Sequence, residues 1–231
     1  MVGFELYKKL KFKSEKTNFL SEKKANFENS EIQIELADLK ILPEVMNFHP
    51  KRREEFLLGR ILLKKAFKNY FNLNVTDFPI DKSRMPIAPS GFVISISHDA
   101  DEVMVAISKI NTSIGIDLEN IGRIKPALEP QILSTDDDVD FLIKESSLNR
   151  DEVLTLVFSA KETLFKALYP LVKQYFGFEK ASLLSIDKNL GTYKIKINSD
   201  LGTGNSFYGN GHSFVGHFAF EGNKLLTFME L

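Results

Sequence analysis

The sequence predicts an α+β fold, and two observations lead to this prediction. Two stretches carry apolar residues at the spacing of long amphipathic helices, one in each half of the 231-residue chain. Around them lie short runs of β-branched and aromatic residues, and several of their connections are short enough to favour antiparallel pairing. A chain of this length forms one large domain or two small ones, so we expect strands and one long helix in each half.

The first half begins with a predicted strand over 31–36, where apolar and polar residues alternate. A helix is predicted over 51–70, because apolar residues recur there at helical spacing and His49 and Pro50 mark its start. Three prolines between residues 78 and 91 then indicate a loop.

Three β-rich runs follow this loop, at Phe92–His98, Val103–Ser108 and Ser113–Glu119. The segments between them are only a few residues long, and connections this short are typical of hairpins. We therefore expect the three runs to form one antiparallel meander.

The second half begins with weak periodicity over 120–148, which predicts a loop containing one short helix near 137–144. A strong amphipathic pattern then predicts a helix over 151–168, and Pro170 is expected to limit its extension. The remaining strand patterns lie at 192–198, 212–220 and 224–230.

The composition excludes several classes of protein. With 43% hydrophobic and 26% charged residues the chain can bury a sizeable core, so disorder is not expected. The absence of cysteine excludes a disulfide framework, a zinc ribbon and a thiol nucleophile, and any metal must be held by oxygen or histidine. A net charge of −1 argues against a general nucleic-acid binder.

The sequence also contains no membrane or export signal. The N-terminus has no apolar core behind its charged residues, and no run of about 18 uncharged apolar residues occurs. We therefore expect a soluble cytoplasmic protein without a membrane partner.

Two carboxylates are predicted to share one face of the strand at Ser113–Glu119. Side chains alternate along a strand, so Asp117 and Glu119 point the same way. Such a pair is useful when a hard cation such as Mg²⁺ lies between the carboxylates. A solvent-exposed strand face has the same pattern, and the residues alone leave both interpretations open.

The helix over 151–168 contains the run FSAKETLFK, in which Glu162 is a further candidate acidic residue. Glu162 and Lys166 are one turn apart and lie opposite the apolar stripe, where the simplest interpretation is a surface ion pair. Lys161 lies at the edge of that stripe, so its side chain either extends to solvent or points into a cleft.

The run ISISH ends a predicted strand with Ser97 and His98. Neighbouring strand residues point to opposite faces, so His98 is not placed to act as the base for Ser97, and we reject a nucleophilic Ser–His pair. Two interpretations remain for this run, contacts with a phosphate or an ordinary hydrogen-bonded histidine at a strand end.

Basic residues gather at the start of the helix over 51–70 and in the loop that follows it. Arg52 and Arg53 lie about two helical turns before Arg60, and Arg84 follows in the loop. Arginine suits phosphate because it forms paired hydrogen bonds, although a solvated basic helix is the default interpretation.

Taken in order, RREEFLLGR, RMP, ISISH, GIDLE and FSAKETLFK resemble the motifs of the Sfp-type 4′-phosphopantetheinyl transferases. The resemblance is greatest to the group typified by the enterobactin synthetase D component. It covers Lys51 to Lys166, about half of the chain, and its most specific part is GIDLE followed about forty residues later by FSAKETLFK.

This resemblance implies two similar α+β subdomains, 1–112 and 113–231, related by a pseudo-twofold axis in a monomer that binds CoA and Mg²⁺ between them. It implies a holo-[carrier protein] synthase, which transfers 4′-phosphopantetheine from CoA to a serine of an apo acyl, peptidyl or aryl carrier protein. The carrier would serve siderophore, other nonribosomal peptide or polyketide synthesis. A catalytically idle relative that only binds CoA or a carrier, or a Mg²⁺-dependent pyrophosphate hydrolase, would retain much of the same pattern.

The resemblance also implies roles for individual residues. Glu162 and Lys166 are the implied catalytic residues, and either Glu162 or a metal-bound water accepts the serine proton. The implied metal ligands are Asp117, Glu119 and Glu162, and the implied CoA contacts are Arg52, Arg53, Arg60, Arg84, Ser97, His98, Lys161 and Lys166. The acidic stretch at 134–140 has no counterpart that we can place in the family.

Overall fold

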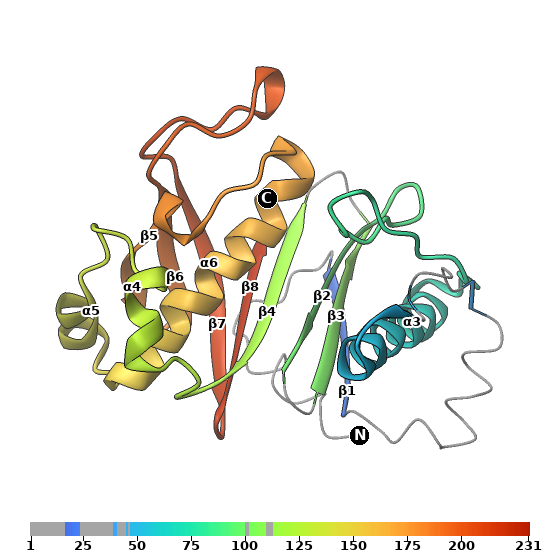
Figure 1. Ribbon diagram of the computed structural model, residues 1–231, viewed down its shortest axis with the longest axis horizontal. Coiled ribbons are helices and arrows are strands. Elements are labelled where there is room, and N and C mark those ends of the chain that lie inside the picture. The colour runs from blue at the N-terminus through green and yellow to red at the C-terminus, as the bar shows by residue number, and fades with distance from the viewer. Residues whose placement is uncertain (1–16, 24–38, 41–44, 46, 100–101, 110–112) are drawn as a thin grey trace. The chain divides into compact units, whose positions relative to one another are not determined.

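The structure is a computed structural model that describes residues 17–23, 39–40, 45, 47–99, 102–109 and 113–231 (Figure 1). The strand expected over 31–36 lies outside the described residues. The described residues divide into two compact units, the first ending at residue 109 and the second beginning at Ser113. Both contain helices and strands, which confirms the α+β class. None of the helices in the described segments has the length and apolar character needed to span a membrane.

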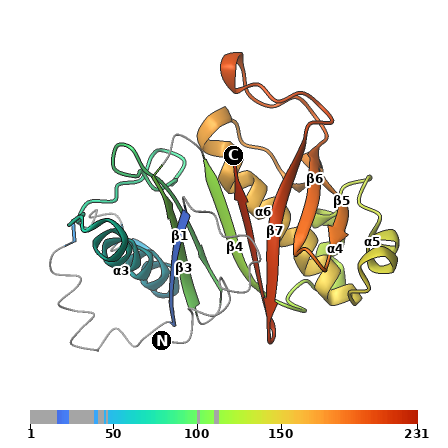
Figure 2. The same cartoon turned by 180° about the vertical axis from the view of Figure 1, so that it is seen from behind.

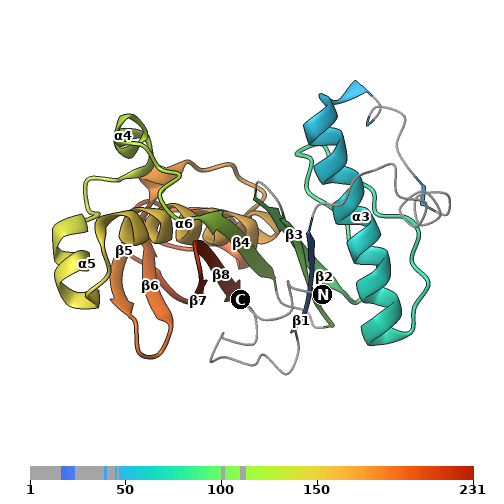
Figure 3. The ribbon, with the colours of Figure 1, turned by 90° about the horizontal axis from the view of Figure 1, so that it is seen from below.

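The first unit is a three-stranded antiparallel sheet packed against one long helix. Its helix, α3, spans Pro50–Phe71, and its strands are β1 (Thr17–Lys23), β2 (Val93–His98) and β3 (Glu102–Ser108). The strand order is β1-β3-β2, and α3 lies along this sheet (Figure 3). Buried apolar residues of α3 and β3 form one cluster between helix and sheet, and partly buried residues of β2 pack against it. The helix predicted over 51–70 and the hairpin of the first two β-rich runs are therefore confirmed.

The second unit is a five-stranded antiparallel sheet with a long helix across one face. Its strand order is β4-β8-β7-β6-β5, and α6 lies on the sheet with the short helices α4 and α5 beside it (Figures 1 and 2). The elements are β4 (Ile114–Asn120), α4 (Glu129–Ile132), α5 (Val139–Ser146), α6 (Arg150–Val172), β5 (Ala181–Asp187), β6 (Thr192–Ile197), β7 (Ser213–Glu221) and β8 (Lys224–Glu230), with 3₁₀ turns at Pro126–Leu128, Phe178–Lys180 and Gly204–Ser206.

The prediction of a three-stranded meander is wrong for its third strand, at Ser113–Glu119. Strand β4 pairs with β8 at the C-terminal end of the chain, with Asp117 opposite Thr227, and does not join β2 and β3. The free edge of β3 is taken by β1, a strand that the sequence analysis missed. The short connection before Ser113 therefore links two sheets, so a short connection by itself did not determine strand pairing.

Helix α6 begins with a reciprocal cap and ends later than predicted. The Asn149 side chain accepts a hydrogen bond from the Glu152 backbone N–H at 3.0 Å, and the Glu152 carboxylate accepts one from the Asn149 N–H at 2.8 Å. The helix continues through Pro170 to Val172, so the expected limit at Pro170 is wrong. In the last turn a proline removes a single intrahelical donor, and the rest of the turn remains satisfied.

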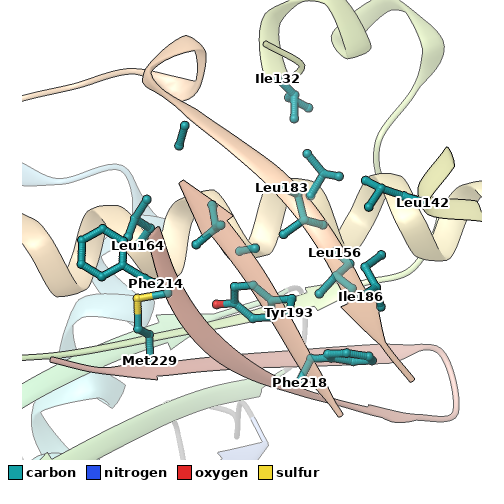
Figure 4. Packing of buried hydrophobic residues seen from close by; sticks show 14 of the residues in the cluster. Ile132, Leu142, Leu156, Leu164, Leu183, Ile186, Tyr193, Phe214, Phe218 and Met229 are labelled. Atoms are coloured by element: carbon teal, nitrogen blue, oxygen red, sulfur yellow. The ribbon is translucent and has the colours of Figure 1, made fainter. Parts of the chain in front are cut away.

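The core of the second unit lies between α6 and the sheet. Buried side chains from the helix, such as Leu156 and Leu164, belong to one cluster with Tyr193 of β6 and Phe218 of β7 (Figure 4). This packing fixes the face of α6 that meets the sheet. It thereby fixes which residues of β4 lie under the helix.

Candidate active site

The acidic face of β4 lies under α6 and is not exposed to solvent. Asp117 is 3% exposed and Glu119 is 5% exposed. On the same face, a Cβ at Gly115 would lie 2.9 Å from the backbone nitrogen of Ala167 and closer still to the carbonyl oxygen of Thr163. The glycine of GIDLE therefore lets the strand approach the helix backbone, which brings the two carboxylates against the helix. Burial excludes the interpretation of this face as a solvated strand surface.

Basic side chains pair with both strand carboxylates. Lys166 donates from Nζ to Asp117 Oδ1 at 2.7 Å and to the Ile116 carbonyl oxygen at 3.0 Å. Arg123 donates to Glu119 Oε2 at 2.9 Å. The sequence analysis missed Arg123, although its i, i+4 spacing from Glu119 in GIDLENIGR is visible in the sequence.

Glu162 of α6 is electrostatically coupled to this group. Burial raises the pKa of its carboxyl, Lys166 opposes the shift, and the charge of Asp117 adds to it. Burial and then the charge of Asp117 also raise the pKa of Glu119 to about 7, against the effect of Arg123. The structure thus gathers the three predicted acidic residues and Lys166 into one interacting group within the second unit.

The donor chemistry of this group fits a hard cation, although the structure does not arrange it as a preformed metal site. Among the described residues, no three Asp, Glu, His or Cys side chains lie together as a metal-binding group. Lys166 and Arg123 instead occupy oxygens of Asp117 and Glu119. Carboxylate oxygens are nevertheless the ligands that Mg²⁺ prefers.

Buried hydroxyl groups support the helix above Asp117. The Thr227 hydroxyl lies 2.6 Å from that of Thr163 and 2.7 Å from that of Ser159, so β8 and α6 are joined by hydrogen bonds. Nearby, burial and then the charge of Asp117 raise the pKa of Tyr193, which keeps that phenol protonated. The position of Asp117 relative to α6 is therefore held by hydrogen bonds as well as by apolar packing.

Lys161, the residue before Glu162, is almost completely buried, with 2% of its surface exposed. Its ammonium group forms an ion pair with Asp137, and burial lowers its pKa while this neighbouring carboxylate opposes the shift. Of the two positions predicted for this side chain, extension to solvent is excluded.

A pocket opens beside Glu162. Its lining comes from the helix, from the segment after it and from the start of β5: Lys161, Glu162, Phe165, Tyr175, Phe176, Gly177, Phe178 and Ala181. Four of these residues are aromatic, so the pocket presents an apolar surface next to one raised-pKa carboxyl.

The first unit carries a separate basic group at the start of α3. Arg52 Nη1 lies 3.1 Å from His98 Nε2, and the buried carboxylate of Glu55 lies 3.5 Å from the same histidine nitrogen. The structure thus brings two predicted CoA contacts together. Glu55 was missed, although its i, i+3 spacing from Arg52 indicates a helix-surface pair.

Arg60 is a buried cation without an anionic partner among the described residues. It is 8% exposed, its guanidinium carbon lies 3.8 Å from the centre of the Phe56 ring, and its Nε donates to no acceptor. Burial and then the charge of Arg52 lower its pKa to about 10. A guanidinium held in this state is stabilised by an added anion.

Two other predicted contacts, Ser97 and Arg84, lie in different surroundings from Arg52 and His98. His98 follows the β2 residues that face α3, whereas the Ser97 side chain points to the opposite face and is 3% exposed. Arg84 is exposed and has a left-handed backbone with φ 68°.

Comparison with known families gives two matches that together cover well over half of the chain. A family model described as the 4′-phosphopantetheinyl transferase N-terminal domain matches residues 43–108. A second, described as the 4′-phosphopantetheinyl transferase superfamily, matches residues 113–210. The second match contains the whole carboxylate group and the pocket beside it.

Curated relatives agree with these matches. The chain is 35% identical over 138 residues to enterobactin synthase component D of Salmonella typhi, which covers 59% of this chain and 56% of the relative. It is 28% identical over 185 residues to the 4′-phosphopantetheinyl transferase Npt of Nocardia iowensis, covering 71% of this chain and 81% of the relative. The chain thus spans little more than half the length of the enterobactin synthase relative.

Proposed function

The chain belongs to the 4′-phosphopantetheinyl transferase superfamily, and from this we propose that it transfers the 4′-phosphopantetheine group of CoA to a serine of an apo-carrier protein. The products would be the holo-carrier and 3′,5′-ADP, which is the reaction of a holo-[carrier protein] synthase. The observation that carries the proposal is the group formed by the buried Asp117 and Glu119 with the partly buried Glu162 and Lys166. It combines carboxylates for a cation with a lysine suited to phosphate charge.

We further propose Mg²⁺ as the metal, held by Asp117, Glu119 and Glu162. When bound, Mg²⁺ would offset the charge of the CoA pyrophosphate. The side chains of Lys166 and Arg123 would move from the carboxylate oxygens that they now occupy. Both are long side chains with several rotatable bonds, so this rearrangement needs no movement of β4 or α6.

In the proposed reaction the serine oxygen bonds to the phosphorus that carries pantetheine, and the bond from that phosphorus to the bridging oxygen of 3′,5′-ADP breaks. Glu162 accepts the serine proton, a role that its raised pKa favours because a more basic carboxylate holds a proton better near neutral pH. Lys166 stabilises the negative charge that moves to the departing 3′,5′-ADP. The aromatic pocket beside Glu162 suits the partly apolar pantetheine chain.

The first unit would bind the CoA phosphates through Arg52, Arg60 and His98. Among the described residues the buried guanidinium of Arg60 has no anionic partner, and this supports the assignment, since an anionic group would complete its surroundings. The roles of Arg53, Arg84 and Ser97 remain predictions from the resemblance. The contacts of Lys161 with Asp137, Ile132 and Phe178 support a different role for this residue.

The proposed carrier belongs to siderophore, other nonribosomal peptide or polyketide synthesis. The relatives from Salmonella typhi and Escherichia coli are components of enterobactin synthase, and this supports the first of these pathways. Action as a cytoplasmic monomer, with subdomains 1–112 and 113–231 related by a pseudo-twofold axis, is proposed on the resemblance alone.

One experiment tests the proposal against its competitors. The protein is incubated with CoA, Mg²⁺ and a panel of apo-carrier proteins, and intact masses are recorded. Transfer adds the mass of phosphopantetheine to a carrier. A hydrolase would consume CoA and leave every carrier unmodified, and an idle binder would leave both CoA and carriers unchanged, so either result contradicts the proposal.

A further inference from the structure

The ammonium group of Lys161 has no donor left for a ligand. Its Nζ donates to Asp137 Oδ2 at 2.5 Å, to the Ile132 carbonyl oxygen at 2.9 Å and to the Phe178 carbonyl oxygen at 3.0 Å. A lysine ammonium carries three N–H groups, so all three are used. A phosphate could bind Lys161 only after one of these buried bonds was broken.

Both carboxylate oxygens of Asp137 also accept hydrogen bonds. Its Oδ2 accepts from the backbone N–H and the hydroxyl of Ser134 at 2.7 and 2.8 Å, besides Lys161, and its Oδ1 accepts from the Leu183 N–H at 2.8 Å. The side chains of the pair are 1% and 0% exposed. An ion pair this deeply buried is retained only with such complete hydrogen bonding, because an unpaired partner would be costly.

The pair joins four segments that meet beside Glu162. Ile132 ends α4, Asp137 belongs to the acidic stretch, Leu183 lies in β5, and Phe178 lines the pocket. Figure 4 shows Ile132 and Leu183 on the side of the core where α4 and β5 approach α6. Since Lys161 precedes Glu162 in α6, the same bonds fix the helix turn that carries the proposed base.

We propose that Lys161 is a positioning residue that acts through Asp137, and that it fixes Glu162 and the Phe178 side of the pocket without contacting CoA. This inference rests on the transferase function proposed above. It differs from the role that the resemblance implies for Lys161, and it gives the acidic stretch at 134–140 a function as the counter-charge of a buried lysine.

The same stretch supplies a matched control. Asp136 pairs with Lys196 at 2.8 Å, but its side chain is 49% exposed and that of Lys196 is 27% exposed. The Asp136→Asn variant therefore removes one ion pair from the same loop without leaving a buried charge. Ion pairs this exposed contribute little, so this variant should match the unmodified protein in every measurement.

The first test compares Lys161→Met, Asp137→Asn and the double variant. CoA affinity is measured by calorimetry at two salt concentrations, and kcat is measured at saturating CoA and carrier. We expect CoA affinity within about twofold of the unmodified protein, with the same salt dependence, and kcat lowered roughly 10- to 100-fold by either single change, since small misplacements of a catalytic group have effects of this size. The double variant should be no worse than either single variant, because the two residues act as one unit.

A CoA-contact role for Lys161 gives a different result. Lys161→Met would then weaken CoA binding by roughly tenfold or more and reduce its salt dependence, while Asp137→Asn would leave kcat near normal. That result overturns the proposal, and so does an unchanged kcat in both single variants. If a single variant fails to fold, CoA affinity and kcat of the double variant are compared with those of the unmodified protein, because the double variant leaves no lone buried charge.

A second measurement separates this inference from the proposed function. Amide hydrogen exchange of Ser134 and Leu183, whose N–H groups donate to Asp137, requires neither CoA nor carrier. Both single variants should lose protection at these amides and near Phe178, and Asp136→Asn should not. If the protein transfers no phosphopantetheine, the proposed function fails while exchange still tests the pair. Unchanged protection in Lys161→Met would overturn the positioning role.

Discussion

At Gly115 a single hydrogen in place of a side chain determines how closely β4 approaches α6. A Cβ there would meet the backbone of Thr163 and Ala167, and backbone atoms in a helix cannot move aside as a flexible side chain can. The carboxylate of Asp117, two residues further along the same face, is thereby held beside Lys166 and Glu162. The spacing of this site therefore depends on a residue that takes no part in the chemistry.

We expect Gly115→Ala to lower the free energy of unfolding by about 3 kcal/mol and to reduce transfer activity, because the new methyl group forces strand and helix apart. Urea unfolding and the carrier mass assay measure the two effects. Gly209→Ala is the matched control, since the atoms nearest its added Cβ lie 3.7 and 3.9 Å away. Equal stability of the two variants would contradict the close approach at Gly115.

Asp117 connects the other members of the site, because its charge adds to the effect of burial in raising the pKa values of Glu119 and Glu162 and its oxygen accepts a hydrogen bond from Lys166. We expect Asp117→Asn to lower kcat by roughly three orders of magnitude, the effect of removing several kcal/mol of charge stabilisation from the transition state. Transfer is followed by intact carrier mass in saturating Mg²⁺. Asp140→Asn, which changes a 95% exposed carboxylate, should retain normal turnover.

Near-normal turnover of Asp117→Asn under these conditions would remove Asp117 from the proposed metal ligands. Circular dichroism of the variant establishes that a loss of turnover does not come from unfolding.

The individual site residues differ in how well the sequence could predict them. Asp117 and Glu119 share a strand face because side chains alternate, and this local rule needs no knowledge of the partner strand. The pairing of Lys161 with Asp137 is not local, since the two residues are 24 positions apart and meet only when the acidic stretch packs on α6. Helical spacing placed Lys161 at the edge of the apolar stripe, but no sequence pattern predicts which residue forms its buried ion pair.

At the scale of single elements, helices were predicted better than strands. Helix α3 extends only one residue beyond each end of the predicted range, because its apolar spacing is regular and a proline marks its start. Strand β5 was missed, and the register shift between Leu183 and Ser185 explains this, since a bulge interrupts the alternation that identifies a strand. Strand β4 was found, but its partner β8 lies more than a hundred residues away.

Helix α3 contains the arginine for which we propose a contact with the CoA phosphates. Its buried Arg60 lacks an anion among the described residues, so 3′,5′-ADP should stabilise the protein by supplying one. At about 100 times the dissociation constant the gain is about 2.7 kcal/mol. We expect Arg60→Met to lose most of this gain while the ligand-free protein changes by no more than about 1 kcal/mol, because a buried unpaired cation is replaced by an apolar side chain of similar length.

Thermal unfolding with and without 3′,5′-ADP measures both quantities. Lys68→Met, in the last turn of the same helix, removes a surface lysine that bonds Asn72 and should leave the ligand effect intact. An Arg60→Met protein stabilised by 3′,5′-ADP as strongly as the unmodified protein would exclude this residue from phosphate binding.

For the whole molecule, a formal charge of −1 conceals two groups of opposite sign. Within the described residues, the first unit holds a buried guanidinium without an anionic partner, and the second holds carboxylates that repel one another. Each group is destabilising by itself and is suited to a ligand of the opposite charge. The stability of the protein is therefore expected to depend on phosphate, on divalent cations and on pH.

The pH dependence follows from the raised pKa values of Glu119, about 7, and of Glu162. Between pH 4.5 and 7 the folded metal-free protein holds protons that the unfolded chain has released, so the stability from these groups is complete below pH 4.5 and is lost as pH rises through the folded pKa. We expect the stability of the unmodified protein relative to Glu119→Gln, which stays uncharged, to fall across this window by up to about 1.4 kcal/mol per pH unit. Urea unfolding in EDTA from pH 5 to 8 measures this difference, and parallel curves for the two proteins would contradict the raised pKa of Glu119.

The same pair of proteins tests the cation. Mg²⁺ binds ionised carboxylates, so it should stabilise the unmodified protein more at pH 8 than at pH 5, where it competes with protons for the same oxygens. Glu119→Gln should show a smaller effect at pH 8, because one donor has lost its charge. Equal stabilisation by Mg²⁺ at both pH values, or in both proteins, would place any bound cation outside the group of Asp117, Glu119 and Glu162.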